Sequence, residues 1–268
     1  MSRPATVTLT EMAESETGLA VRRATRVGWD GLTVGRAPGH VQANLVVLPE
    51  RFADDFAAFC TANPAACPLL ARGTPGAVAL PTLAQDLDLR SDLPAYLVHE
   101  NGCARRVGDL RSVWRGDLVA FAIGCWFGAE AALRAAGIRL RHVELGIQGP
   151  LFRTDRRTVA CGPFAGPLVV SMRPFATADV ETVAAITAAL PRSHGAPIHA
   201  GDPAALGIMH PDMPDWGEPL RPEPGETALF WPCGLTALAA VEAARVPFFI
   251  THAPGAMLVT DLLEGDIR

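Results

Sequence analysis

The sequence contains no lysine, because all 23 of its basic residues are arginine. This absence excludes a lysine Schiff base, a covalently held pyridoxal phosphate and the lysine of a phosphate-binding loop. A catalytic nucleophile must therefore be a Cys, Ser, Thr, Asp or Glu side chain.

Other common signals are missing as well. The net charge is −5 and no basic stripe is present, which argues against a nucleic-acid partner. No apolar run approaches the ~18 residues of a membrane span, and residues 1–15 lack the apolar segment of a secretion signal. We therefore expect a cytoplasmic protein without a membrane partner. The six cysteines form no CxxC pair or zinc-finger spacing, so we expect reduced thiols.

The order of the expected elements favours an α/β fold. Residues 41–48 and 117–123 are short apolar runs typical of buried strands. The order strand, turn, alanine-rich helix, strand occurs over residues 117–144 and again over residues 228–251. This alternation predicts a three-layer α/β core with a mostly parallel sheet.

The segment between these two units has a different pattern. Residues 151–159 and 167–175 are expected to be strands, residues 177–190 a helix capped by Thr177, and residues 196–200 a short strand. We therefore predict a smaller α+β domain, residues 148–223, inserted into a core domain formed by residues 1–147 and 224–268.

Four segments rich in glycine and proline carry most of the reactive side chains. They are GCWFGAE (124–130), HGAPIHAGDP (194–203), FWPCG (230–234) and THAPG (251–255). Such segments favour turns, and turns on a rigid scaffold are common places for functional sites. We predict that they form the walls of one pocket.

Cys125 and Cys233 each stand where an expected strand turns into a helix. Unpaired amides at such a position can lower a thiol pKa or hold a carboxylate, although a cysteine there can also be a small packing residue. Glu130 lies in an apolar helix, where a buried carboxylate would suit a general acid and an exposed one would be solvated.

Histidines supply the candidate acid–base groups. His194, His199 and Asp202 lie within ten residues, and His252 with Asp261 can join them from the C-terminal segment. This set could form a proton relay or hold a divalent metal, but the spacing is no established zinc pattern. We favour the acid–base role and expect no resident metal.

Two arginines are candidates for binding a substrate carboxylate. Arg173 ends an apolar strand before Pro174, and Arg90 lies in the loop DLRSDLP. A guanidinium can hold a carboxylate through two parallel hydrogen bonds, while the alternative for each is a structural ion pair. Two such clamps would suit a dicarboxylic or amino-acid substrate.

Several motifs together resemble one known family. They are GHVQANLVVLP, FCTANPAACPLL, DLRSDLPAYLV, DLVAFAIGCWFGAEAAL, GPLVVSMRP, HGAPIHAGDP, FWPCG and HAPGAMLVTD, in this order from about residue 30 to the end. They resemble the putative hydro-lyase family of bacteria, which also forms the D-glutamate cyclase domain of animal mitochondria. The resemblance implies an α/β plus α+β fold and the cyclisation of D-glutamate to 5-oxo-D-proline with loss of water.

The sequence departs from the family pattern at three places. Trp126 replaces a serine, Ala256 replaces a histidine, and Thr236-Ala237-Leu238 replace Thr-Pro-Gln. The loss of a histidine at 256 removes one acid–base candidate from an expected site loop. Another substrate, or binding without turnover, therefore stays open.

The leading prediction is a cytoplasmic lyase that removes water from a small amino or hydroxy acid, with D-glutamate as the best guess. Arg173 would hold the α-carboxylate, the amides near Cys125 and Cys233 would stabilise negative charge, and His252 or His199 would move a proton, with Glu130 supplying a second. The alternatives are a cysteine-dependent amidohydrolase and a non-catalytic protein that binds small carboxylates. A homo-oligomer is possible under each hypothesis.

Overall fold

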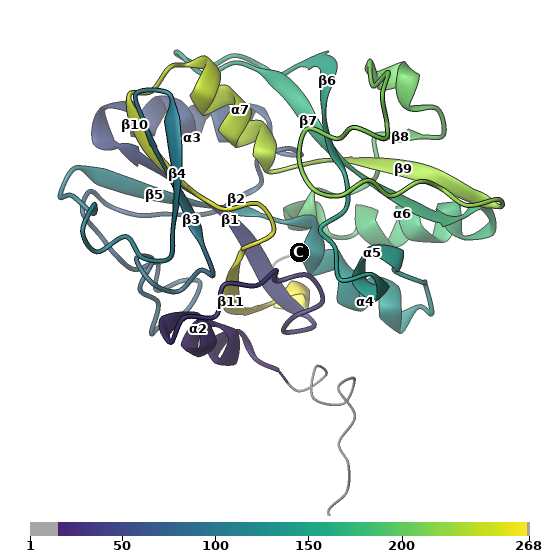
Figure 1. Ribbon diagram of the computed structural model, residues 1–268, viewed down its shortest axis with the longest axis horizontal. Coiled ribbons are helices and arrows are strands. Elements are labelled where there is room, and N and C mark those ends of the chain that lie inside the picture. The colour runs from purple at the N-terminus through teal and green to yellow at the C-terminus, as the bar shows by residue number, and fades with distance from the viewer. Residues whose placement is uncertain (1–15, 267–268) are drawn as a thin grey trace, which may run out of the picture.

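A computed structural model describes residues 16–266 and contains two β-sheets (Figure 1). Sheet A has seven strands in the order β2-β5-β1-β10-β3-β4, with β11 pairing to β1. Its strands are β1 (His40–Pro49), β2 (Leu69–Arg72), β3 (Tyr96–Glu100), β4 (Cys103–Val107), β5 (Leu118–Gly124), β10 (Phe248–His252) and β11 (Leu258–Leu263). Sheet B has the order β6-β7-β9-β8, with strands β6 (Leu151–Arg157), β7 (Pro167–Ala176), β8 (His199–Ala200) and β9 (Glu226–Pro232).

Short helices connect and cover the sheets. The α-helices are α2 (Gly18–Arg26), α3 (Ala53–Ala62), α4 (Glu130–Ala135), α5 (Arg141–Glu144), α6 (Val180–Ala188) and α7 (Leu235–Ala243). The 3₁₀ turns are η1 (Glu50–Phe52), η2 (Trp126–Ala129), η3 (Thr177–Asp179), η4 (Pro191–Ser193), η5 (Pro203–Leu206) and η6 (Glu264–Asp266). Within residues 16–266, no helix combines the length and apolar character needed to cross a bilayer.

The predicted mostly parallel α/β core is wrong, because every strand pair in both sheets is antiparallel. Only the second strand–helix–strand unit forms as predicted, because residues 141–144 of the first unit are helical, and in both segments the chain crosses from one sheet to the other. The first leaves β5 of sheet A and enters β6 of sheet B, and the second leaves β9 of sheet B and enters β10 of sheet A. A unit whose two strands join different sheets creates no parallel pair, so the alternation does not imply a parallel sheet here.

The burial of β1 explains why its sequence suggested a parallel sheet. Val46 and Leu48 face α3 and α7, while Leu45 and Val47 pack against the opposite layer of loops and strands. Both faces of this central strand are therefore covered, and its second half, residues 45–49, is a continuous apolar run. Such a run is typical of parallel sheets, but an antiparallel strand buried on both faces needs the same residues.

Two local expectations also differ from the structure. Residues 138–144 were expected to form a strand, but residues 141–144 form helix α5. Thr177 does not cap α6, because its hydroxyl donates to Gly225 O instead. The other expected strands and helices occur close to their predicted positions, although β8 spans only two residues. The division into an inserted domain and a core domain stays a prediction.

Sheet B is covered on both faces by different clusters. Trp231 and Phe175 pack with Trp126 and Val183 on the face near α4 and α6. Met172 and Phe230 pack with Phe152 on the opposite face. Because side chains alternate along a strand, the residues beside Met172 in β7, Ser171 and Arg173, project to the other side of the sheet. This alternation carries Arg173 to the region between the two sheets.

Candidate functional site

A narrow cavity lies where the two sheets meet. Its walls come from β1 and β10 of sheet A, β6 and β7 of sheet B, and the turns that follow β5 and β9. Five residues predicted from the sequence line it, namely Cys125, Arg173, His194, Cys233 and His252. The cavity offers ≈ 30 Å³, space for about two water molecules.

The two cysteine turns are built in the same way. The backbone N–H of Phe127 donates to Cys125 Sγ, and the backbone N–H of Leu235 donates to Cys233 Sγ. Each thiol therefore accepts a hydrogen bond from an amide at the start of the helical segment that follows it. Helices leave N–H groups unpaired at this position. The amides predicted to receive a substrate carboxylate are thus partly taken by the thiols themselves.

Both cysteines are half-buried, and their thiols stay protonated at neutral pH. Desolvation raises the pKa of Cys233 to about 11 and raises the pKa of Cys125 well above its usual range, and the amide donors only partly oppose this. A nucleophilic thiolate needs the opposite shift. The geometry therefore favours a packing and hydrogen-bonding role for these thiols over attack on a substrate.

Asn44 of β1 connects the two cysteine turns. Its Nδ2 donates to Gly124 O at 2.8 Å, immediately before Cys125. Gly234, immediately after Cys233, lies so close to the Asn44 amide that a Cβ on it would overlap that group. One side chain of the central strand thus fixes the spacing of both turns. Sequence reasoning missed Asn44, although it lies in the otherwise apolar run of β1.

His252 is the cavity histidine best placed to move a proton. Its Nδ1 lies 3.3 Å from Leu45 N and 3.4 Å from Leu45 O, so it accepts from the one or donates to the other according to the tautomer, and Nε2 has no protein hydrogen bond among the described residues. Burial lowers the pKa of His252 to about 4. The imidazole is therefore neutral at pH 7, and when Nδ1 accepts from Leu45 the proton resides on Nε2.

His194 is held differently. Its Nδ1 donates to Ala65 O at 2.8 Å, and the Gly124 carbonyl also faces the ring. Desolvation lowers the pKa of His194 to about 4. The residue has a φ of 74°, a left-handed conformation that is uncommon for a side chain of this size. His194 therefore anchors its loop to the end of β5.

Arg173 is a buried cation without a carboxylate partner. Its Nη1 and Nη2 donate to Met172 O and Gln148 O, both at 2.7 Å, and it forms no ion pair within residues 16–266. Desolvation lowers the pKa of Arg173, although the distant Glu130 opposes the shift. Gly149 makes this packing possible, because a Cβ there would contact the guanidinium. A buried, unpaired guanidinium suits an anionic ligand.

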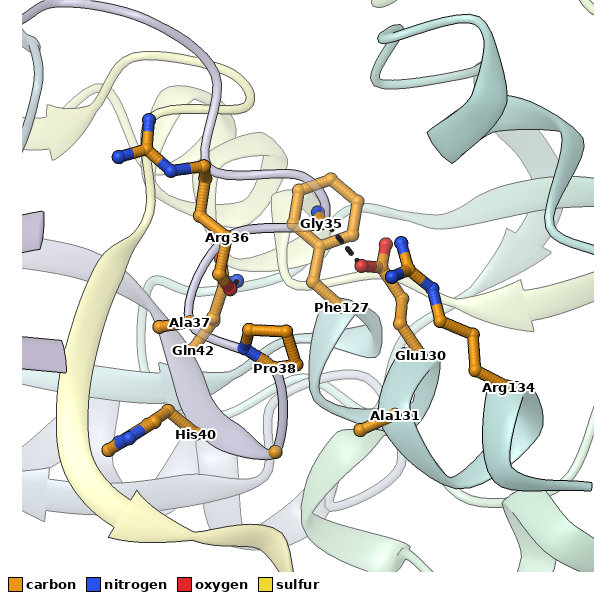
Figure 2. Close-up of a pocket in the computed structure, with 11 residues that line it drawn as sticks. Gly35, Arg36, Ala37, Pro38, His40, Gln42, Phe127, Glu130, Ala131 and Arg134 are labelled. Atoms are coloured by element: carbon orange, nitrogen blue, oxygen red, sulfur yellow. Dashed lines mark hydrogen bonds between the residues drawn. The ribbon is translucent and has the colours of Figure 1, made fainter. Parts of the chain in front are cut away.

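Glu130 does not line the cavity but a separate pocket, which it shares with Gly35 and Phe127 (Figure 2). Its Oε2 accepts from Gly35 N at 2.9 Å and its Oε1 lies 3.0 Å from His142 Nε2. His142 packs its ring edge-on against Trp126. The carboxylate is buried, as expected for a general acid, but the contacts of both oxygens hold η2 in place. Its predicted proton-transfer role stays a prediction.

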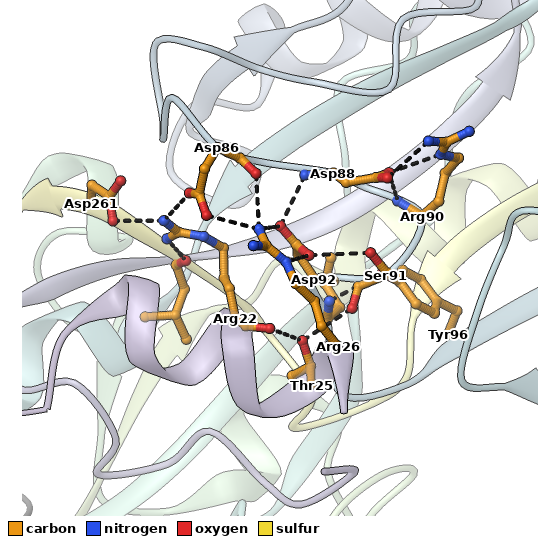
Figure 3. Close-up of polar contacts among 12 residues, drawn as sticks. Arg22, Thr25, Arg26, Asp86, Asp88, Arg90, Ser91, Asp92, Tyr96 and Asp261 are labelled. Atoms are coloured by element: carbon orange, nitrogen blue, oxygen red, sulfur yellow. Dashed lines mark hydrogen bonds and ion pairs between the residues drawn. The ribbon is translucent and has the colours of Figure 1, made fainter. Parts of the chain in front are cut away.

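Three other predicted site residues lie outside the cavity. Arg90 is paired with Asp88 in a surface network (Figure 3). His199 Nε2 bonds Asp202 O at 2.7 Å, and its ring lies against Phe230, on the face of sheet B away from Arg173. Asp202 caps η5 through Ala204 N. The structure therefore brings the cysteine turns, His194 and His252 to one cavity, and it leaves these three residues, which were predicted to share the pocket, outside it.

Asp261 belongs to a network that fastens helix α2 to the sheet (Figure 3). The fully buried Arg22 pairs with Asp86 and Asp261, and Arg26 pairs with Asp86 and Asp92. No group of three or more His, Cys, Asp or Glu side chains in the described part of the chain could hold a metal ion.

Glu264 contacts two segments beside the cavity, η2 and η4. Both of its carboxylate oxygens lie 3.0 Å from Ser193 Oγ, next to His194. The carboxylate also fills the space that a Cβ on Gly128 of η2 would need. Burial raises the pKa of Glu264 to about 7. The C-terminal segment therefore ties η2 and η4 together.

Comparison with known proteins identifies the family. The D-glutamate cyclase family matches residues 119–261. A protein of Methylobacterium radiotolerans named "Putative hydro-lyase" is 52% identical over 92% of this chain and 92% of its own. Proteins with the same name from Verminephrobacter eiseniae and Bordetella petrii are 50% and 49% identical, covering 92% and 96% of this chain and 90% and 98% of their own.

The chain belongs to the D-glutamate cyclase family of hydro-lyases. The family resemblance inferred from the motifs is thereby confirmed, and so is the assignment to the lyases. A nitrogen repressor-like protein from Methanococcus jannaschii superposes with a TM-score of 0.37 at 9% identity, covering 91% of this chain and 98% of that one, a similarity too low to support an argument.

The departures from the family pattern lie at different distances from the cavity. Trp126 lines it directly. Ala256 is buried in a small cluster with Ala95 and Ala253 and does not line it. Ala237 and Leu238 of α7 are buried in the cluster that includes α3 and do not line the cavity. Of the three departures, therefore, only Trp126 contributes to the walls of the cavity.

Proposed function

We propose that the protein cyclises D-glutamate to 5-oxo-D-proline with release of water. Its membership of the D-glutamate cyclase family supports the reaction class. The observation that carries the proposal is Arg173, a buried guanidinium that lines the cavity and lacks a carboxylate partner in the part of the chain that the structure describes. A buried cation of this kind is stabilised by an anionic ligand such as a substrate carboxylate.

The proposed reaction balances without a co-reactant. The amine nitrogen attacks the carbon of the side-chain carboxyl group, so a C–N bond forms and a C–O bond breaks. The two protons lost from the ammonium leave with the departing oxygen as water. Arg173 holds the α-carboxylate, and the neutral His252 carries a proton between nitrogen and oxygen through Nε2.

The enclosed site favours loss of water. Most residues that line the cavity are buried, so a substrate bound among them would be largely shielded from solvent. This shielding strengthens the electrostatic contacts of Arg173. The raised pKa values of Cys125 and Cys233 give no support to the alternative of a cysteine nucleophile.

The test is a direct assay with each enantiomer of glutamate. Purified protein is incubated with D- or L-glutamate, with and without added divalent cation, and 5-oxoproline is separated by chiral chromatography. We expect 5-oxo-D-proline from the D enantiomer only. Absence of product under all these conditions would refute the cyclase proposal.

A further inference from the structure

Three buried polar atoms around the cavity have no hydrogen-bond partner among residues 16–266. They are Trp126 Nε1, Ser171 Oγ and Arg173 Nε. Their side chains are only 3%, 2% and 2% exposed. Because buried polar groups are almost always paired, three unpaired atoms around one cavity indicate a ligand that supplies the missing partners.

Arg173 accounts for one acceptor group of that ligand. Its Nη1 and Nη2 each donate one hydrogen to a backbone carbonyl, Met172 O and Gln148 O. The Nε–H and a remaining Nη hydrogen can together hold one carboxylate in the usual two-pronged arrangement. This leaves the donors of Trp126 and Ser171 without a partner.

An indole N–H can only donate, so the group that faces Trp126 must be an acceptor. The indole is fixed by its neighbours, because Trp231 and His142 lie 5.3 Å and 5.5 Å from its ring centroid. Ser171 is two residues from Arg173 in β7, so both side chains project from the same face. Trp126, Ser171 and Arg173 therefore approach one small volume from two sides.

We infer that Trp126 Nε1 and Ser171 Oγ form a second acceptor-binding subsite, which selects ligands with a second carboxylate beside the one bound by Arg173. This subsite takes the place that sequence reasoning gave to Arg90. The inference rests on the proposed function in taking the cavity as the substrate site. It assigns a specificity role to Trp126, which departs from the family pattern.

The chain supplies a matched control for Trp126. Trp231 packs against it in the same cluster, but its Nε1 donates to Thr187 Oγ1 at 3.3 Å and it does not line the cavity. Replacing either tryptophan by phenylalanine keeps an aromatic ring and removes one N–H. Only the Trp126→Phe substitution removes a donor that faces the cavity.

The experiment measures binding of two unreactive probes by calorimetry. Glutarate carries two carboxylates, and valerate has the same number of carbons with one. The wild-type protein should bind glutarate more tightly than valerate. Trp126→Phe and Ser171→Ala should each weaken glutarate binding about tenfold, the cost of losing one hydrogen bond to a charged group, while valerate binding stays the same. Trp231→Phe should change neither.

Three results would overturn the subsite. They are unchanged glutarate affinity in Trp126→Phe, an equal loss in Trp231→Phe, and no glutarate binding by the wild-type protein at millimolar concentration. Circular dichroism confirms that each variant is folded. If glutarate selectivity is observed but D-glutamate is not cyclised, the proposed function fails and the subsite remains. If D-glutamate is cyclised without glutarate selectivity, the subsite fails and the proposed function remains.

Discussion

The guanidinium of Arg173 lies over the indole ring of Trp126, with 5.3 Å between Arg173 Cζ and the ring centroid. The electron-rich face of the ring offsets part of the cost of burying this charge. No carboxylate in the described chain completes the pairing. The folded protein therefore maintains a cation whose partner must come from outside, which costs stability.

Replacing Arg173 should lower activity without lowering stability. We expect Arg173→Met to leave the thermal midpoint unchanged or higher, because an uncompensated buried charge is removed. The value of kcat/KM should fall roughly a hundredfold, as expected for the loss of a charged clamp. Arg153→Met on neighbouring β6 is the control, because Arg153 pairs with Asp215 at the surface. Wild-type KM in Arg173→Met would contradict the clamp.

The cysteine turns should tolerate serine. Cys125→Ser and Cys233→Ser should keep turnover within about tenfold of wild type, because a hydroxyl can accept the same amide N–H and neither thiol is ionised at pH 7. Cys103→Ser, in an exposed strand, controls for handling of the protein. A loss of roughly a thousandfold in either variant would instead indicate a nucleophile.

The two cavity histidines should respond differently to substitution. His252→Gln should lower kcat about a hundredfold or more with little change in KM, because it removes the proton carrier. His194→Gln should mainly lower the thermal midpoint, because its ring anchors a loop to Ala65 O. Steady-state kinetics and thermal melts of both variants make the comparison. Equal kinetic losses in the two variants would contradict this assignment of roles.

The pH dependence follows from the low pKa of His252. Burial places it at about 4, so the imidazole stays neutral as pH falls from 8 to 5. The logarithm of kcat/KM should therefore lack an acidic limb centred near 6.5, the ordinary value for histidine. Stability from this group is present above 6.5 and is lost as pH falls through about 4. A limb at 6.5 that disappears in His252→Gln would contradict the prediction.

Glu264 should give the opposite trend in stability. Its pKa in the folded protein is about 7, raised from 4.5 by burial, so the folded state binds the proton more tightly than the unfolded chain. Its contribution is full below 4.5 and is lost as pH rises to about 7. Relative to Glu264→Gln, the wild-type free energy of unfolding should fall by ~3 kcal/mol between pH 4.5 and pH 8. Urea unfolding measures this difference, and a difference independent of pH would contradict it.

Local patterns were sufficient to predict much of the site. The turns at Cys125 and Cys233 could be located because a strand, a glycine and a helix follow one another in the sequence. Arg173 was found because a charge at the end of an apolar strand requires a reason. His252 was found because it lies in a turn rich in glycine and proline, THAPG. Each of these signals depends on residues that are neighbours in the chain.

The missed features depend on contacts distant in sequence. Nothing local distinguishes a helix that returns to its own sheet from one that crosses to another, so the antiparallel topology was not predicted. Arg90 is an exception, because its ion-pair partner Asp88 is only two residues away in the polar loop that carries both. The roles of Trp126 and Ser171 depend on which hydrogen-bond partners are absent in the folded chain, and a sequence does not show such absences.

Because the cavity lies between the two sheets, a ligand bound in it would link them. Asn44 and His252 belong to sheet A, whereas Ser171 and Arg173 belong to sheet B, so a bound dicarboxylate contacts both. Pulling the sheets apart would first require its release, and its occupancy adds directly to the work of unfolding. Substrate supply in the cell would therefore regulate how long each copy survives unfolding and proteolysis.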